Sequence, residues 1–251
     1  MGNVTTITAA AESGSPEAEC PSRDTGWQPT PLGPAWPARS VVGMNEGHAR
    51  LCPSPEWAAH IQDEILPSLT RHADLGADML EIGPGPGAAT EWLRHRVRRL
   101  TAQEVDQAAA EALAGKYAGG NVTVVVGDAA DLSFPGESFD SAGSFTMLHH
   151  VPTPALQNKI LAEVLRVLKP GGVLIGSDSL ASNDLHHFHA GDTYNPVDPA
   201  WLLGRLQTLG FGEITVIVDD TLKFIARKPA EAAGSSAGSD AEAAACRISR
   251  S

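Results

Sequence analysis

Short apolar runs alternate with segments of helical periodicity between residues 43 and 229. The runs are rich in β-branched residues, and a helical pattern separates each from the next. Such alternation predicts a doubly wound, mostly parallel sheet with helices on both faces. The expected strands are 79–82, 98–103, 122–126, 139–145 and 173–177, and the expected helices are 55–69, 88–96, 106–117, 154–168 and 199–209.

Three of the predicted helices begin with a capping residue followed by proline. These pairs are Ser54-Pro55, Thr153-Pro154 and Asp198-Pro199. The side-chain oxygen of the cap accepts from a free backbone N–H, and proline is suited to the first helical position, where its missing N–H costs nothing. Asp106 is expected to cap the helix at 106–117 in the same way.

The alternation stops near the end of the chain. Two apolar runs, 214–218 and 222–226, are separated only by Asp219-Asp220-Thr221. A link this short cannot hold the crossover that parallel strands need, so the runs should form an antiparallel hairpin. With the five earlier strands, this predicts a seven-stranded sheet that ends in the hairpin.

The segments outside the alternation differ in composition. Residues 1–42 and 230–251 are rich in Ala, Ser and Gly, and prolines are frequent in the first of them. We expect a disordered or loosely docked N-terminal tail, a folded domain over 43–229 and a disordered C-terminal tail.

The charge balance is acidic, with 18 Lys and Arg against 30 Asp and Glu, and with 14 against 23 in residues 43–229. An acidic body repels phosphate backbones, which argues against a nucleic-acid partner. The basic run at 94–99 is interpreted as a solvated helix end.

No apolar stretch is long enough to span a membrane, and three unpaired cysteines favour a reducing compartment. We therefore expect a soluble, cytoplasmic monomer or homodimer.

The chemistry of the chain begins in the segment from Met79 to Thr90, which runs from a strand through Gly83-Pro84-Gly85-Pro86-Gly87 into a helix. Glycines let the backbone approach a ligand closely and adopt positive φ. By itself the loop does not settle which nucleotide it binds, since Gly83-x-Gly85-x-x-Ala88 also satisfies the relaxed dinucleotide pattern.

Two acidic residues follow at the ends of the next strands. Glu104 ends the second strand, where a carboxylate can accept from ribose hydroxyls. Asp128 ends the third strand and is placed to accept from an adenine amino group. A dinucleotide enzyme would also carry the first of these residues, so the loop and Glu104 together leave both cofactors open.

Two further segments help to distinguish between the two possible cofactors. Phe139-Asp-Ser-Ala-Gly-Ser-Phe-Thr-Met-Leu-His-His-Val151 covers the fourth strand and its end, and Lys169-Pro-Gly-Gly172 turns into the fifth. In this order, with the Gly83-x-Gly85-x-Gly87 loop and Gly127-Asp128, the chain resembles the class I S-adenosylmethionine-dependent methyltransferases. The resemblance is to small-molecule members of the kind found in quinone and secondary-metabolite biosynthesis. It is strong over about 75–180 and extends through the terminal hairpin.

The resemblance implies S-adenosylmethionine as the cofactor and gives each matching residue a place around it. The methionine part would lie at the glycine loop, the ribose at Glu104, the adenine between Asp128 and Ala129, and the amino group at the end of the fourth strand. The implied cofactor-binding residues are Glu81, Gly83, Pro84, Gly85, Gly87, Glu104, Asp128, Ala129, Ser144 and Phe145.

The residues after the fourth strand indicate the class of substrate. The loop also resembles that of rRNA adenine dimethylases, but those carry an Asn-Leu/Ile-Pro-Tyr-like motif where this chain has Ser144-Phe-Thr-Met-Leu-His149. With the acidic composition, this favours a small-molecule substrate. His149 and His150 follow the strand end where open α/β sheets bind ligands, so one of them is our candidate general base.

Further pocket residues are expected in two segments. His186, His189 and Tyr194 lie in the stretch 179–197, a candidate pocket wall or lid, and His48 and Trp57 precede the core. Histidines this close together can suggest a metal site, but no second cluster of suitable spacing supports one, so substrate-facing or solvated histidines are expected instead.

Two alternatives remain open from the sequence. One is a nicotinamide-dependent oxidoreductase built on the same glycine loop, which predicts a continuing parallel sheet and leaves the Lys-Pro-Gly-Gly turn unexplained. The other is a methyltransferase fold used as a non-methylating binding or cyclase module, because cofactor binding does not prove transfer.

Overall fold

The computed structural model describes residues 4–9 and 45–230, and their strands form one eight-stranded sheet. The sheet order is β1-β7-β8-β6-β5-β2-β3-β4. Strands β6, β5, β2, β3 and β4 are parallel, whereas β8 is antiparallel to both β6 and β7. The predicted mostly parallel sheet with a terminal hairpin is confirmed. Its strands are β2 (Asp78–Ile82), β3 (Arg99–Glu104), β4 (Val122–Val126), β5 (Phe139–Phe145), β6 (Leu168–Asp178), β7 (Gly212–Val218) and β8 (Leu222–Arg227).

The eighth strand was not predicted. β1 (Thr5–Ala9) pairs antiparallel with β7 at the sheet edge, although we expected no regular structure before residue 43. Four of its five residues are exposed, so the strand lacks the buried face that would mark it in sequence. The remainder of the expected N-terminal tail and the C-terminal tail lie outside the described residues.

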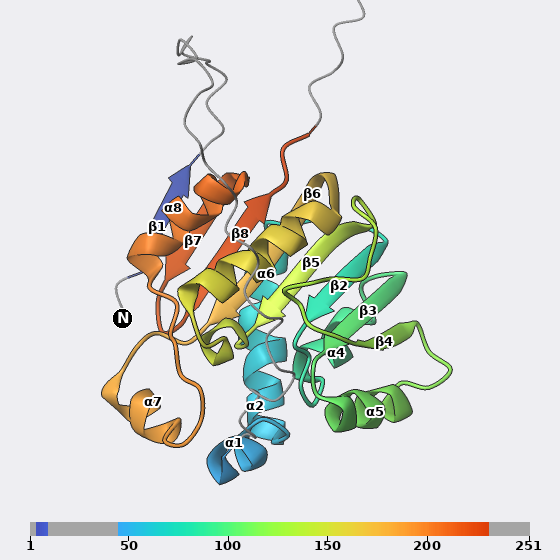
Figure 1. Ribbon diagram of the computed structural model, residues 1–251, viewed down its shortest axis with the longest axis vertical. Coiled ribbons are helices and arrows are strands. Elements are labelled where there is room, and N and C mark those ends of the chain that lie inside the picture. The colour runs from blue at the N-terminus through green and yellow to red at the C-terminus, as the bar shows by residue number, and fades with distance from the viewer. Residues whose placement is uncertain (1–3, 10–44, 231–251) are drawn as a thin grey trace, which may run out of the picture.

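The helices occupy both faces of the sheet, as Figure 1 shows for α6 and α8 in front. Successive residues of a strand point to opposite faces, and Leu80 packs in the cluster with α6 and α8 while Met79 packs with the helices behind. The predicted helices appear as α2 (Pro55–Ala59), the π-helix η1 (His60–Ile65), α3 (Leu66–Thr70), α4 (Ala88–Leu93), α5 (Gln107–Lys116), α6 (Pro154–Val167) and α8 (Pro199–Leu209).

The predicted caps are also present. The side chains of Ser54, Thr153 and Asp198 each accept from a backbone N–H in the first turn of α2, α6 and α8, and Asp106 does so for α5. Three short elements were missed: α1 (Glu46–Leu51), the 3-10 turn η2 (Leu148–His150) and α7 (Asn183–Phe188). None exceeds six residues, which is too short for a helical period to stand out.

The strand order reverses between β2 and β5. The parallel part of the sheet starts in the middle at β2, proceeds outward to β3 and β4, and then returns to β5 on the other side of β2. In open α/β sheets the crevice at such a reversal, beyond the carboxyl ends of the strands, is where ligands bind. Helices α1 and α7 lie at this end of the sheet (Figure 1).

Candidate active site

The glycine loop and the segment after β5 meet at the strand-order reversal. Gly83 has φ +63°, and a Cβ added there would lie 2.3 Å from Cγ of Met147. Gly83 also donates to the carbonyl of Gln103, which joins the loop to the end of β3. A side chain at this position would therefore meet both an unfavourable backbone conformation and a neighbouring loop.

Space opens over the next glycine. Gly85 also has positive φ, and a Cβ built on it meets nothing within 4 Å. Its N–H donates to Oε2 of Glu104 at 3.2 Å, while Oε1 of the same carboxylate accepts from the N–H groups of Val105 and Asp106. Glu104 thus holds the end of β3 against the glycine loop, at the place where ribose hydroxyls are expected.

Glu81 is buried beneath the loop. Its Oε2 accepts from the hydroxyl of Thr90 at 2.7 Å, and burial raises the pKa of its carboxyl to about 7, with a further contribution from nearby Glu104. A carboxyl held between its two protonation states near neutral pH can act as either donor or acceptor. Thr90, at 0% exposure, was not identified from the sequence.

The remaining predicted cofactor residues lie at the ends of β4 and β5. Asp128 accepts from the N–H of Ala130 at 2.8 Å, which shapes the turn after β4, and Ala129 packs against the core at its edge. Ser144 is buried with a hydroxyl oxygen that has no partner among the described residues, and the Phe145 ring packs in the core. The orphaned Ser144 hydroxyl is a group that a ligand can satisfy. The cofactor residues implied by the resemblance therefore fit a nucleoside at this edge.

Thr146 carries backbone strain at the same strand end. Its φ is +52°, a conformation that a β-branched residue rarely adopts. Such strain persists where surrounding structure enforces it, and it collects at ligand sites. Thr146 also lines a cavity of about 310 Å³, a size typical of small-ligand pockets. Its lining also includes Trp57, His60, Ile65, Ser179, Leu180 and Thr221.

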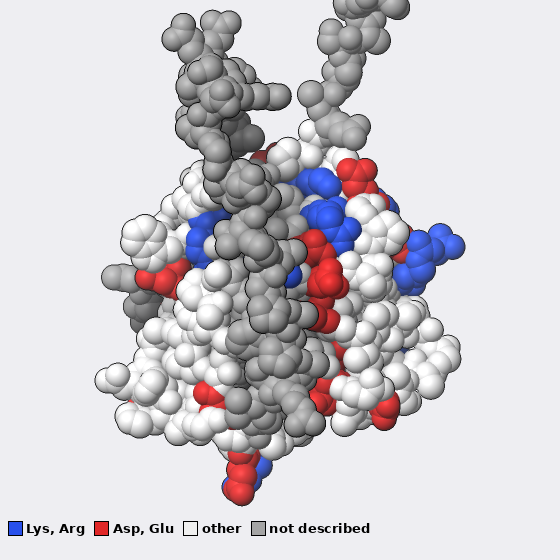
Figure 2. All heavy atoms as spheres, viewed as in Figure 1, with Lys and Arg blue, Asp and Glu red and all other residues white. Residues whose placement is uncertain are grey.

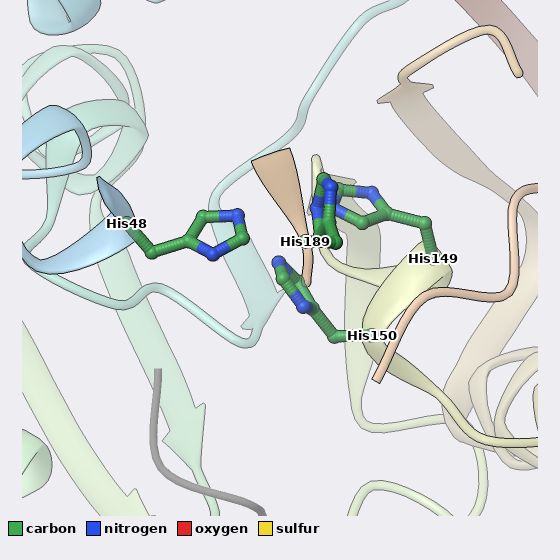
Figure 3. Close-up of side chains that lie close together, drawn as sticks. All are labelled: His48, His149, His150 and His189. Atoms are coloured by element: carbon green, nitrogen blue, oxygen red, sulfur yellow. The ribbon is translucent and has the colours of Figure 1, made fainter. Parts of the chain in front are cut away.

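Four of the predicted pocket histidines lie together beside this edge. His48 comes from α1, His149 and His150 from η2, and His189 from the end of α7 (Figure 3). One ring nitrogen of each lies within 4.8 Å of those of the others. His48, His149 and His189 are at most 4% exposed.

Carboxylates hold two of these rings. Asp178 accepts from Nδ1 of His149 at 2.5 Å and also from the His149 backbone N–H, and Asp192 pairs with Nδ1 of His48 at 2.6 Å. Asp178 is completely buried. It ends β6, next to the strand that leads to His149, so its position at a strand end is the sequence signal that would have identified it.

The two candidate bases, His149 and His150, differ in how well each can accept a proton. Burial lowers the pKa of His150 to about 3, and the neighbouring histidines add to the effect, so its ring is neutral and weakly basic near neutral pH. His149 instead has its Nδ1 fixed by Asp178, and a ring that donates from Nδ1 keeps the lone pair of Nε2 available. Of the pair, His149 is the better placed to accept a proton.

Of the other predicted substrate residues, two lie at the histidines or the cavity and one lies away from them. Tyr194 stacks on His189 with ring centroids 4.2 Å apart, and its buried hydroxyl has no partner among the described residues. Trp57 lines the cavity. His186 is exposed, with its ring 6.2 Å from that of Tyr194, so it lies outside the group.

Comparison with known proteins finds similarity to methyltransferases. Residues 80–176 match the family described as "Methyltransferase domain". A probable S-adenosylmethionine-dependent methyltransferase of Mycolicibacterium smegmatis is 28% identical, over 63% of this chain and 59% of its own length. The phthiotriol/phenolphthiotriol dimycocerosates methyltransferase 1 of Mycobacterium ulcerans is 30% identical over 47% and 44%, respectively. A probable ribosomal RNA small subunit methyltransferase A of Pyrobaculum aerophilum is 44% identical over 26% and 28%. The chain thus matches less than two thirds of the length of these relatives.

Solved structures agree on the fold. An S-adenosylmethionine-dependent methyltransferase from Methanosarcina mazei superposes with a TM-score of 0.57 at 21% identity, covering 66% of this chain and 99% of that one. The cyclase SpnF superposes with a TM-score of 0.54 at 17% identity, covering 70% and 82%. The same architecture therefore occurs in a methyltransferase and in a cyclase.

Proposed function

We propose that this chain, as a member of the class I S-adenosylmethionine-dependent methyltransferases, transfers a methyl group from this cofactor to an oxygen, nitrogen or carbon nucleophile of a small molecule. The contact between Gly83 and Met147 carries the proposal. It places the glycine loop beside the segment that leads to the cavity and the histidines, so a methyl donor on one side would face an acceptor on the other.

The residues of the chain would position the two reactants. Glu104 and the space over Gly85 would hold the ribose and the adjoining part of the cofactor, and Asp128 with Ala129 would flank the adenine. When bound, the cofactor supplies an electrophilic methyl group on a sulfonium. The protein's contribution is alignment of the nucleophile with that methyl group and exclusion of water, both of which lower the barrier of a displacement.

Three observations favour a small acceptor over RNA. The cavity beside Thr146 has the volume of a small-ligand site. The charge of the domain is acidic. Basic and acidic side chains are intermixed on the visible part of the face in Figure 2, whereas a phosphate backbone calls for a continuous basic surface.

No described helix is long and apolar enough to cross a membrane. A cytoplasmic location and a monomeric or homodimeric state stay predictions.

The proposal is tested with cofactor that carries an isotopically labelled methyl group. The full chain is incubated with this cofactor and a panel of phenols, carboxylic acids and amines, and separately with ribosomal RNA. Mass spectrometry should find the label on small molecules. Label on RNA alone would contradict the substrate class. Cofactor binding with no transfer to any acceptor would favour the cyclase or binding alternative.

General-base catalysis by His149, which the sequence predicts, is tested separately. If it operates, His149→Ala should lower kcat by about 100-fold or more, as expected when a positioned base is lost, while His150→Ala has a smaller effect. Near-normal turnover of both variants at saturating substrate would show that alignment suffices.

A further inference from the structure

The histidine cluster has the composition of a metal site. His48, His149, His150 and His189 each offer one ring nitrogen, and these atoms lie within 4.8 Å of one another. Ligand nitrogens around a tetrahedral zinc ion at 2.0–2.1 Å are about 3.3 Å apart, so ring rotations that close the widest pair by about 1.5 Å would complete the arrangement. Figure 3 shows the four rings gathered in one place.

Three of the four rings have one nitrogen held as in metal sites. Nδ1 of His48 pairs with Asp192, Nδ1 of His149 with Asp178, and Nδ1 of His189 with the carbonyl of Leu185 at 2.6 Å. Metal-ligating histidines almost always donate their second N–H to a carboxylate or carbonyl, which fixes the ring and leaves the other lone pair for the metal.

His189 provides an independent sign that a group is needed at the centre. Its side chain is 3% exposed, and its Nε2 has no hydrogen-bond partner among the described residues. A buried polar atom without a partner costs about 1–3 kcal/mol. A cation between the four rings would accept the lone pair of this atom and remove that cost.

The charges also call for a cation. Asp178 and the side chain of Asp192 are buried against the cluster, and each carries a negative charge when ionised. The imidazole rings pack tightly beside these carboxylates, with the ring centroids of His48 and His189 only 4.4 Å apart. Two buried carboxylates that hold imidazole rings from outside form the arrangement that surrounds metal-bound histidines.

We propose that His48, His149, His150 and His189 bind one Zn²⁺ ion, which fastens α1 and the segment after α7 to the carboxyl end of β5. Imidazole ligands suit zinc, and four protein ligands fill its tetrahedral shell. The ion therefore closes the substrate side of the site by joining three segments that are distant in sequence.

The metal site runs against the expectation from sequence that no metal binds. That expectation rested on ligand spacing, whereas the ligands are contributed by α1, η2 and the end of α7 and have no regular spacing. While the ion is bound, His149 has no free lone pair, so the metal site replaces general-base catalysis by His149 and methyl transfer then relies on alignment. The metal site does not depend on the proposed methyl transfer.

The test measures metal directly on the full chain after removal of any affinity tag. Protein is stripped with a chelator, titrated with Zn²⁺ and analysed by mass spectrometry of the metal after desalting. We expect one zinc ion per chain, and visible absorption typical of tetrahedral Co²⁺ when cobalt replaces zinc. Substoichiometric zinc in the wild-type chain, or an octahedral cobalt spectrum, would overturn the proposal without any variant being needed.

Variants then assign the ligands. His189→Ala and His48→Ala should each weaken zinc binding at least tenfold, whereas His187→Ala, which alters an exposed histidine on α7, should bind like the wild type. Equal zinc affinity in all of these variants would contradict the assignment. Titration with S-adenosylhomocysteine on the same samples reports the cofactor side separately, so failure of the metal site and failure of the proposed function are distinguishable.

Discussion

The two halves of the site are built in different ways. The cofactor half comes from consecutive strand ends, with Gly83, Glu104 and Asp128 each at or just after the end of its own strand in chain order. The histidine half is assembled from α1, η2 and α7, and carboxylates from two further positions hold its rings. A local motif suffices to find the first half. The second becomes visible only when distant segments are placed in space, and the predictions below test this division.

The largest effect is expected in the histidine half. Asp178→Ala leaves the buried His149 ring and two backbone N–H groups without their acceptor. Each buried polar group left without a partner costs about 1–3 kcal/mol, so the summed loss should reach about 3 kcal/mol or more. Denaturant unfolding should show a loss of this size. Asp184→Ala, on the exposed side of α7, is the control and should change stability by less than about 0.5 kcal/mol. Similar losses in both variants would show that the hydrogen bonds of Asp178 do not stabilise the histidine half.

The next effect belongs to the cofactor half and depends on pH. Burial raises the pKa of Glu81 to about 7 in the folded chain, above the ordinary value of 4.5. Between these values the folded state binds more protons than the unfolded state, so stability falls as pH rises and the loss is complete above about pH 7. The span corresponds to about 3 kcal/mol. Glu81→Gln cannot ionise and should lack this part of the dependence.

Unfolding in urea at about pH 5 and about pH 8 measures the difference between wild type and Glu81→Gln. The two proteins should differ most in relative stability at the higher pH, with the wild type less stable. Parallel pH profiles would mean that Glu81 ionises normally in the folded chain.

Cofactor affinity should respond to Glu104. Glu104→Gln weakens the acceptor for the Gly85 N–H and removes the charge expected to hold ribose hydroxyls. Hydrogen bonds to charged groups contribute about 1.5–3 kcal/mol, so affinity for S-adenosylhomocysteine should fall by roughly 10- to 100-fold in isothermal titration. Glu111→Gln on the exposed side of α5 should bind normally. An unchanged affinity for Glu104→Gln would remove this residue from the cofactor site.

The smallest effect compares two glycines of positive φ. Gly83→Ala and Gly119→Ala both place a Cβ on a left-handed backbone, which costs about 1–2 kcal/mol. Only at Gly83 does the Cβ also meet Met147, whereas at Gly119 it meets nothing within 4 Å. Gly83→Ala should therefore be the more destabilised in thermal unfolding and should alone lose cofactor affinity. Equal behaviour would contradict the contact between the two loops.

The parts that the sequence predicted share a local cause. The strands of the parallel sheet, the proline-preceded caps and the hairpin at 212–227 follow from periodicity and turn chemistry within a few residues. β1 was missed because its exposed residues have one strand partner, β7, near the other end of the chain. The gathering of His48 and His189 around His149 depends on two short helices and a long segment whose positions no local pattern fixes.

The most direct test of the family assignment is isothermal titration of the full chain with S-adenosylhomocysteine and with NADH. The open space over Gly85, the Glu104 carboxylate and the match of residues 80–176 predict one site per chain that prefers S-adenosylhomocysteine. Preference for NADH would contradict this account and favour the oxidoreductase alternative.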